Sequence, residues 1–310
     1  MPSNFIITGA SGFIGAAVVE TLLSKGKRVT ALCRAESDMS RLSKLRGFET
    51  ILYRDLQDPD LFHRLAGRAS AVFIHCAWSG VGGQSRNEAY QVTENISLTL
   101  KSVELAAASG CSQWIGLGSQ AEYGNQNRRL NEDAPLRPTT IYGKAKLAAG
   151  VASLALCEAR KISGVWLRVF STYGPGDSPN WFIPYIIKEI IGGRAPKLTN
   201  CEQLWDYLYV ADAASAIVAV GDGATCGVFN LGSGSARPLR DYVDTILRDL
   251  GATVTPMYGA VPYRTDQVMH LEADVTLLSK LTKWQPTTGM SEGISATVAF
   301  ERTRSNLLSS

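Results

Sequence analysis

The feature that most constrains the fold of this chain is a glycine-rich turn directly after a short apolar run near the N-terminus. Residues 5–7 are Phe-Ile-Ile, and glycines follow at positions 9, 12 and 15. A helical pattern over 16–23 comes next, so we expect a strand, a tight turn and a helix. Glycine lets the backbone approach a ligand closely, and the first N–H groups of a helix attract an anion. This order of elements favours a site for the pyrophosphate of a dinucleotide.

The residues beyond the turn supply the context that this interpretation requires. Lys25-Gly26 is expected to end the helix, and a second strand is expected at 28–33. Three glycines could serve chain reversal alone, but strand, helix and strand together form the βαβ unit of dinucleotide-binding folds. The residues expected to hold the cofactor in the turn are Gly9, Ser11, Gly12, Phe13, Ile14 and Gly15.

Apolar strand-like runs alternate with helical patterns through the first two thirds of the chain. This alternation predicts an α/β fold with a doubly wound parallel sheet of the Rossmann type. In such sheets a ligand binds at the carboxyl ends of the strands. We expect strands at 4–8, 28–33, 49–52, 71–76, 113–118 and 164–170, and a returning strand at 228–231.

The alternation stops near residue 173, where glycine, proline and aromatic residues become frequent. We expect a smaller, interleaved C-terminal lobe that selects the substrate. The expected division is a dinucleotide-binding domain over 1–172 with a returning segment at about 205–232, and a substrate-binding lobe over about 173–204 and 233–302.

Composition places the chain among ordinary globular proteins. Of its 310 residues, 45% are hydrophobic and 19% are charged, and the net charge is +3. The charges are spread along the chain and no window has the roughly 18 apolar residues of a membrane span, so neither nucleic acid nor a membrane is expected as partner. Six cysteines stand singly, which predicts reduced thiols, a cytoplasmic location and no metal site.

A tyrosine and a lysine one helical turn apart are the main candidates for chemistry. Tyr142 and Lys146 begin a predicted helix, and this spacing places both on one face. A free phenol has a pKa of about 10, and an ammonium held nearby lowers it toward neutrality. The pair therefore predicts a proton donor and acceptor, although a helix can show such a pair by chance.

Residues at the ends of two predicted strands adjoin the same edge of the sheet. Ser119 ends the strand that begins at Gln113, and its hydroxyl can donate a hydrogen bond to a substrate oxygen. Cys76 and Ala77 end the preceding strand and are expected to border the cofactor. His75, just before them, is expected to be a core histidine and not a base.

With these residues in order, the chain resembles the extended short-chain dehydrogenase/reductases, the nucleotide-sugar epimerase and dehydratase superfamily. The resemblance implies hydride transfer between a nicotinamide and a sugar carbon. Tyr142 would move the hydroxyl proton, Ser119 would polarise the same oxygen, and Lys146 would hold the ribose and lower the pKa of the tyrosine. The resemblance covers nearly the whole length and also includes Gly-Ser-Gln-Ala-Glu-Tyr-Gly from 118, Arg-Val-Phe-Ser-Thr-Tyr-Gly-Pro-Gly from 168 and Asp-Tyr-Leu-Tyr-Val from 206.

The resemblance implies further ligand contacts, and for two of them another role stays open. Asp55 would bracket the adenine, but it could be a turn residue. Asn95 could order a water or Lys146, or it could cap a helix or face solvent. The guanidinium of Arg264 suits a diphosphate. The implied cofactor contacts are Asp55, Leu56, Cys76, Ala77, Asn95 and Lys146, and the implied contacts to the nucleotide sugar are Ser119, Gln120, Tyr142, Ser171 and Arg264.

Departures from the family patterns narrow the activity. Dehydratases of the superfamily have an Asp-Glu pair after the serine or threonine, whereas this chain has Gln120-Ala121. Trp205 stands where epimerases similar to UDP-galactose 4-epimerase commonly have an arginine. NAD-specific members end the second strand with an acidic residue, whereas here Cys33 is followed by Arg34. An arginine suits a 2′-phosphate, so NADP is favoured over NAD unless Arg34 is a solvated loop charge.

These departures favour a reductase within the superfamily. The expected reaction is NADPH-dependent reduction of the C4 ketone of a nucleotide-linked 4-keto-6-deoxysugar, as in sugar-nucleotide 4-ketoreductases. The alternatives are an NAD-dependent nucleotide-sugar 4-epimerase and a non-catalytic NAD(P)-sensing module, which usually lacks the tyrosine or the lysine. The resemblance also implies a homodimer through the helices around 92–108 and 142–156.

Overall fold

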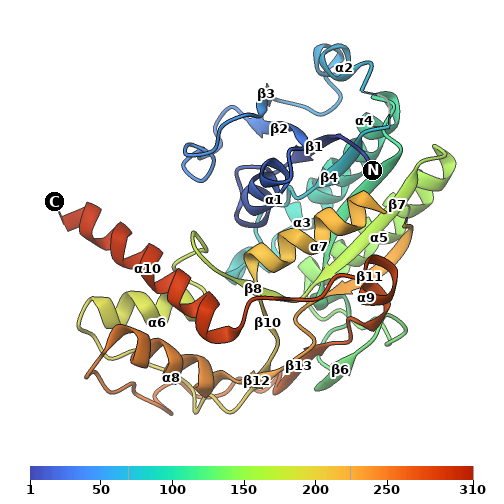
Figure 1. Ribbon diagram of the computed structural model, residues 1–310. Coiled ribbons are helices and arrows are strands. Elements are labelled where there is room, and N and C mark those ends of the chain that lie inside the picture. Colours follow the sequence, from blue (N-terminus) through green and yellow to red (C-terminus); the bar gives the residue numbers. More distant parts are fainter. Residues whose placement is uncertain (69, 224, 310) are drawn as a thin grey trace.

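The computed structural model describes residues 1–68, 70–223 and 225–309 (Figure 1). Within these residues the centre is a seven-stranded sheet of order β11-β7-β5-β4-β1-β2-β3, in which all neighbouring strands are parallel. The strand order reverses direction between β1 and β4, so the sheet is doubly wound as expected. The strands are β1 (Asn4–Thr8), β2 (Arg28–Arg34), β3 (Glu49–Tyr53), β4 (Val72–His75), β5 (Gln113–Ser119), β7 (Ser163–Val169) and β11 (Gly227–Leu231).

Helices cover both faces of this sheet (Figure 1). On one face α1 (Phe13–Ser24) packs against α7 (Val210–Asp222), and their apolar residues bury one side of the strands. On the other face α4 (Asn95–Ala108) packs against α5 (Ile141–Ala159), with α2 (Pro59–Leu65) nearby in the same cluster. Each fully buried aliphatic side chain in these layers contributes about 1.5–3 kcal/mol, so the sheet is a rigid platform for its carboxyl-end loops.

A smaller lobe is built on short strands and on helices from the second half of the chain (Figure 1). One pair of strands is β8 (Ser171–Tyr173) with β10 (Tyr207–Tyr209), and α6, α8 and α10 surround the apolar core. Its other sheet has the order β12-β9-β13-β6. The bounds are β12 (Arg237–Pro238), β9 (Leu204–Trp205), β13 (His270–Ala273), β6 (Arg128–Leu130), α6 (Phe182–Ile191), α8 (Leu239–Leu250) and α10 (Met290–Ser309).

The remaining elements are short turns and helices. The turn η1 (Gly83–Asn87) and helix α3 (Tyr90–Thr93) follow β4, and the turn η2 (Gln120–Glu122) follows β5. Helix α9 (Thr276–Thr282) packs on β11 and α7. None of the helices in the described ranges combines the length and the apolar content that a membrane span needs.

Each strand expected from the sequence is present, with ends shifted by at most one residue. The helical pattern around 92–105 is interrupted at Glu94 and becomes α3 and α4. Strand β6 lies within the first 172 residues but joins the sheet of the lobe, which no local pattern indicated. A three-residue strand is stabilised by its neighbours and not by its own propensity, so its partner decides where it forms.

One buried carboxylate fastens the lobe to the segment that returns from the main sheet. Asp206, fully buried just before β10, accepts hydrogen bonds from the backbone N–H of Ser233 at 2.7 Å and of Gly234 at 3.0 Å. It also accepts one from Ala273 of β13 at 3.0 Å. Its oxygens therefore join the turn after β11 to the four-stranded sheet.

We expect Asp206→Ala to lower the free energy of unfolding by on the order of 3 kcal/mol or more, because one buried and two partly buried N–H groups would lose their acceptor. Urea denaturation of the purified variant measures the change. Asp133→Ala, at an exposed position, serves as the matched control and is expected to change stability by about 0.5 kcal/mol or less. A loss below about 1 kcal/mol in Asp206→Ala would show that these hydrogen bonds do not hold the lobe.

Candidate active site

The turn between β1 and α1 requires glycine at two positions. Gly9 has a φ of +67°, and a Cβ there would lie 2.6 Å from the backbone nitrogen of Ala77. A Cβ at Gly15 would collide with the Gly9 carbonyl. Gly12 precedes α1, and no side chain of the described residues caps this helix end. The turn thus leaves both space and N–H donors for a pyrophosphate, so it fits a dinucleotide.

A cavity of about 170 Å³ opens beside the glycine turn at the carboxyl ends of β1, β2 and β4. This is the edge where a doubly wound sheet binds its ligand. Six residues expected to hold the cofactor therefore line one cavity, together with side chains that the sequence did not single out. The expected ones are Gly9, Ser11, Gly12, Arg34 and the pair Cys76-Ala77, and the others include Cys33, Tyr53, Trp78, Ser79 and Leu98.

The residues expected around the adenosine are only partly brought together. Arg34 lines the cavity with a side chain that is 53% exposed, and its Nε lies 3.5 Å from the Glu36 carboxylate. Asp55 is bound to Lys101 at 2.9 Å and Leu56 is buried in the core, so neither is among the cavity-lining residues. Their contact with the adenine stays a prediction.

Asn95 is a buried supporting residue. Its Oδ1 accepts a hydrogen bond from the backbone N–H of Ser79 at 3.0 Å, and its Nδ2 donates to the Ser79 carbonyl at 3.0 Å. Gln91 accepts a further hydrogen bond from Nδ2 at 3.1 Å. The asparagine therefore does not face solvent, and among the described residues its side-chain hydrogen-bond partners are Ser79 and Gln91 and not Lys146. It fixes the loop that lines the cavity.

His75 is a core histidine, as expected. Its Nδ1 lies 2.7 Å from the Thr8 hydroxyl, and its ring stacks on Trp114. Burial, together with the charge of Lys146, lowers the pKa of His75 to about 3. The imidazole is therefore neutral at physiological pH and takes no proton there.

Ser119 and Tyr142 meet because η2 and α5 approach closely. Gly143 lies against the Ala121 carbonyl, where a Cβ would come within 2.5 Å of the oxygen. The Thr140 hydroxyl caps α5 by accepting a hydrogen bond from Gly143 N–H at 3.1 Å. This contact places the Tyr142 phenol beside the Ser119 hydroxyl. Burial raises the pKa of Tyr142, and the hydrogen bond with Ser119 opposes part of that rise. The Ser119 hydroxyl and the Tyr142 phenol therefore lie beside each other at the carboxyl end of β5.

Lys146 lies one turn after Tyr142 and is 4% exposed. Its Nζ donates a hydrogen bond to the Leu117 carbonyl at 2.7 Å and lies 3.6 Å from the centre of the Trp78 ring. Burial lowers the pKa of Lys146 to about 7, although the nearby Glu122 and Cys76 oppose this shift. The ammonium is held behind the cavity by β5 and Trp78, a place that suits a contact with the cofactor ribose.

Arg86 is a site residue that sequence reasoning missed. It belongs to η1, and its Cζ lies 4.5 Å from the centre of the Tyr142 ring. Burial raises the pKa of Tyr142, while the Ser119 hydrogen bond and the charge of Arg86 lower it. Burial outweighs both, so the pKa of Tyr142 is raised. The sequence predicted that Lys146 lowers this pKa toward neutrality, and that prediction is wrong. No local pattern marks Arg86, because η1 reaches α5 only through the tertiary fold.

Glu122 fixes Ser119 from behind. Its Oε1 accepts hydrogen bonds from the Ser119 backbone N–H at 2.8 Å and from Trp166 Nε1 at 3.0 Å. Its Oε2 accepts one from Arg168 Nε at 2.9 Å, which makes a buried ion pair. The Ser119 hydroxyl in turn accepts from Ala121 N–H at 3.1 Å, so the two residues form a capping box. The Ser-x-x-Glu spacing is a signal that could have identified this role.

The expected substrate residues occupy different surroundings. Gln120 opens η2 beside Ser119. Ser171 accepts a hydrogen bond from Trp205 Nε1 at 2.7 Å. Trp205, which stands where related epimerases commonly have an arginine, is therefore fixed against β8. Arg264 is 74% exposed and lies 3.7 Å from Asp266. Its expected diphosphate contact stays a prediction.

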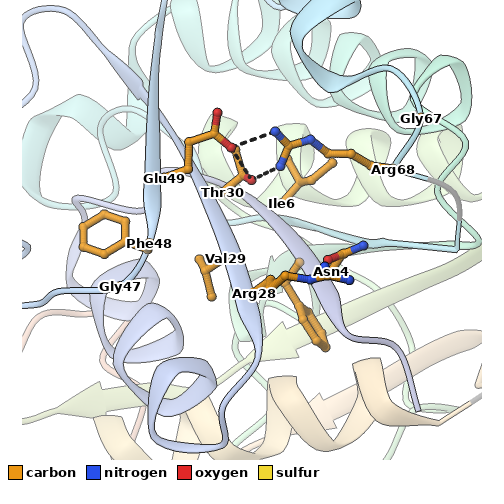
Figure 2. A pocket seen from close by; sticks show the side chains of 11 residues that line it. Asn4, Ile6, Arg28, Val29, Thr30, Gly47, Phe48, Glu49, Gly67 and Arg68 are labelled. Carbon is orange, nitrogen blue, oxygen red and sulfur yellow. Dashed lines mark hydrogen bonds and ion pairs between the residues drawn. The ribbon is translucent and has the colours of Figure 1, made fainter.

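A larger cavity of about 390 Å³ lies at the opposite edge of the sheet (Figure 2). It is lined by Asn4, Arg28 and Glu49, which begin β1, β2 and β3. Figure 2 shows Arg68 bound to Glu49 and Thr30, so its charge is already balanced. The carboxyl-end cavity is therefore the better candidate site although it is smaller.

A glycine turn on a Rossmann sheet, together with a serine, a tyrosine and a lysine at its carboxyl edge, defines an NAD(P)-dependent oxidoreductase of the extended short-chain dehydrogenase/reductase type. The chain belongs to the NAD dependent epimerase/dehydratase family, whose sequence profile matches residues 5–232.

Relatives with different activities share nearly the full length. The chain is 27% identical to a dTDP-glucose 4,6-dehydratase of Streptomyces griseus, over 97% of this chain and 94% of the relative. It is 27% identical to a UDP-glucose 4-epimerase of Mycolicibacterium smegmatis, over 97% and 99%. It is 26% identical to a dTDP-6-deoxy-L-talose 4-dehydrogenase (NAD(P)+) of Kitasatospora kifunensis, over 94% of each.

Solved structures share the fold. A UDP-N-acetylglucosamine 4-epimerase from Methanobrevibacter ruminantium superposes with a TM-score of 0.88 at 24% identity, over 97% of this chain and 99% of the other. MoeE5 in complex with UDP-glucuronic acid and NAD superposes with a TM-score of 0.82 at 26% identity, over the same shares.

We expect Glu122→Ala to lower the free energy of unfolding by about 3–5 kcal/mol, because Arg168 would stay buried without its partner. The double variant Glu122→Leu with Arg168→Met is expected to regain part of this loss, since neither charge remains. Thermal and urea unfolding of the single and double variants measure both effects. A double variant less stable than Glu122→Ala would contradict the ion-pair explanation.

Proposed function

We propose that this enzyme reduces the C4 ketone of a nucleotide-linked 4-keto-6-deoxysugar, with NADPH as the favoured reductant. One observation carries the proposal. Ser119 and Tyr142 meet at the carboxyl end of β5, while the next two positions, Gln120 and Ala121, hold no carboxylate. Elimination of water from the sugar would need an acid and a base there, whereas reduction of a ketone needs only a proton donor at the oxygen.

The nearest carboxylate to Ser119 supports the same distinction. Both oxygens of Glu122 are engaged, Oε1 by Ser119 N–H and Trp166 and Oε2 by Arg168. A carboxylate in a buried ion pair is a poor general base, because protonation would leave the arginine unpaired. Glu122 is therefore a support for Ser119 and does not replace the missing Asp-Glu pair.

The chain's own residues act on the oxygen at C4. When bound, a reduced nicotinamide supplies the hydride that reaches the ketone carbon. Tyr142 donates its phenolic proton to the oxygen as negative charge develops there, and Ser119 donates a hydrogen bond to the same oxygen. Lys146 holds the ribose from its position beside the Leu117 carbonyl. The relative from Kitasatospora kifunensis supports this assignment, because its name describes a 4-dehydrogenase of a dTDP-linked 6-deoxysugar that uses NAD(P)+.

A nucleotide-sugar 4-epimerase is the second candidate. A UDP-glucose 4-epimerase is among the relatives, and MoeE5 holds NAD with a UDP-sugar. Glu36 also lies 3.5 Å from Arg34, which lines the cavity, and an acidic group there would suit the ribose of NAD. An epimerase returns its hydride to the same sugar, so NAD carried through purification would favour this candidate over the reductase.

We propose a homodimer through the helices around 92–108 and 142–156, which belong to α3, α4 and α5. Helices α4 and α5 lie side by side on one face of the sheet (Figure 1). Val151 of α5 is 64% exposed and Val92 of α3 is 48% exposed. Apolar side chains on an outer helical face are suited to burial by a second copy.

We expect Tyr142→Phe to reduce turnover by about two to four orders of magnitude, because the proton donor is lost. NADPH oxidation with a panel of 4-keto-6-deoxysugar nucleotides, with the products identified by NMR, measures the effect. NADPH affinity, followed by fluorescence titration, should stay nearly unchanged. Tyr185→Phe in α6, whose hydroxyl accepts from Lys197 N–H at 3.2 Å, is the control. Unchanged turnover in Tyr142→Phe would remove this residue from the mechanism.

We expect Arg34→Asp to lower the ratio of kcat/KM with NADPH to that with NADH by about 10- to 100-fold, as expected when charge-assisted hydrogen bonds to a phosphate are lost. Arg28→Asp is the matched control, because Arg28 begins the same strand that Arg34 ends. Steady-state kinetics with both coenzymes measure the ratio. An unaltered ratio would show that Arg34 does not contact the 2′-phosphate.

A further inference from the structure

Charged groups face Tyr142 from separate elements. Arg86 of η1 lies over the phenol ring, with Cζ 4.5 Å from its centre. Lys146 of α5 has its Nζ 5.9 Å from the same centre. Glu122 of η2 lies on the Ser119 side and is the negative charge among them. The Trp78 ring closes another side edge-on, at 6.1 Å between ring centres. Tyr142 is 7% exposed, so burial raises the pKa of its phenol, and the neighbouring groups modify that pKa further.

The two cations differ in what else they contact. The Lys146 ammonium is bound to the Leu117 carbonyl at 2.7 Å and lies 3.6 Å from the centre of the Trp78 ring. Because burial lowers the pKa of Lys146 to about 7, part of its population is neutral at physiological pH. An arginine keeps its charge throughout the physiological range. Arg86 is also the nearer of the two, with its Cζ 4.5 Å from the centre of the Tyr142 ring against 5.9 Å for the Nζ of Lys146.

Among the residues that the structure describes, no carboxylate pairs with Arg86. Its Nε is buried without a hydrogen-bond partner among the described residues. The charged groups that act on it are Tyr142, which favours its cationic form, and Arg264, which opposes it. A partly buried cation without a counter-ion is unfavourable, and the cost falls when a negative charge forms beside it. The Tyr142 phenolate is such a charge.

We propose that Arg86 is a positioning residue for proton transfer at Tyr142, whose stacked guanidinium stabilises the phenolate that forms when the phenol gives up its proton, leaving Lys146 to hold the cofactor ribose. The proposal rests on Tyr142 being the proton donor of the proposed function. In the proton transfer the phenolic O–H bond of Tyr142 breaks and an O–H bond forms on the sugar oxygen. The proton passes to the sugar oxygen in reduction and returns to the phenolate from that oxygen in the reverse direction.

The sign of the effect follows from the charges. An opposite charge within about 4–6 Å favours the ionised form of an acid by about 1–3 pKa units. Removing the Arg86 charge should therefore raise the pKa of Tyr142. A neutral side chain of similar length keeps much of the contact with the ring but not this effect, so charge and packing can be separated.

The test is a pH titration of Tyr142 itself, which needs no substrate. The full-length protein is prepared with 3-fluorotyrosine at its 11 tyrosines and followed by 19F NMR. The resonance that is absent in Tyr142→Phe belongs to Tyr142. We expect Arg86→Met to raise its titration midpoint by about 1 pH unit or more and Arg86→Lys to restore part of the shift. Lys144→Met, which removes an exposed positive charge from the same helix, is the matched control.

Two outcomes would overturn the proposal. The first is a titration midpoint of Tyr142 in Arg86→Met that lies within about 0.3 pH unit of the midpoint in the fluorinated protein without substitutions. The second is a shift of this midpoint in Lys144→Met that equals the shift in Arg86→Met. Thermal unfolding of each variant identifies a loss of folding, and Arg86→Lys then supplies the deciding titration. If no 4-keto sugar nucleotide is turned over but the midpoint shifts as expected, the proposed substrate is wrong while the role of Arg86 stands.

Discussion

The buried contact between Glu122 and Arg168 is the interaction on which the candidate site depends. The Glu122 carboxylate also accepts hydrogen bonds from the Ser119 backbone N–H and from Trp166 Nε1. This one charged group therefore links the end of β5 to β7. A buried charge pair is geometrically demanding, because each oxygen must keep its partner. The hydrogen bond from Ser119 N–H to this carboxylate fixes Ser119. The close contact of Gly143 with η2 then places Tyr142 beside it.

The two sides of this site suit different ligands. The glycine turn and the cavity beside it present backbone N–H groups and small side chains, which suit a cofactor held by its phosphates. The side formed by η1, η2 and α5 presents a serine, a phenol and two cations, which suit a carbonyl oxygen that becomes negative. Asn95 supports the first side by fixing Ser79, and Glu122 supports the second.

Much of the fold could be predicted because its elements are locally encoded. The strands of the main sheet are apolar runs bounded by turns, and all were found with ends shifted by at most one residue. The glycine turn, Ser119, Tyr142 and Lys146 could also be identified as candidates, because each belongs to a short motif whose residues are close together in the sequence. Strand β6 and the break at Glu94 were not, because both depend on neighbours remote in sequence.

The sequence alone determined the Rossmann-type order of elements, the glycine turn and the tyrosine and lysine on one helical face, because each follows from residues within a few turns of one another. Only the tertiary structure decided that Arg86 lies over Tyr142, that Lys146 is bound to Leu117, and that Asn95 supports a loop. These contacts join segments that are separated along the chain. Ionisation and burial in a protein depend on such neighbours in space, so local sequence patterns cannot encode them.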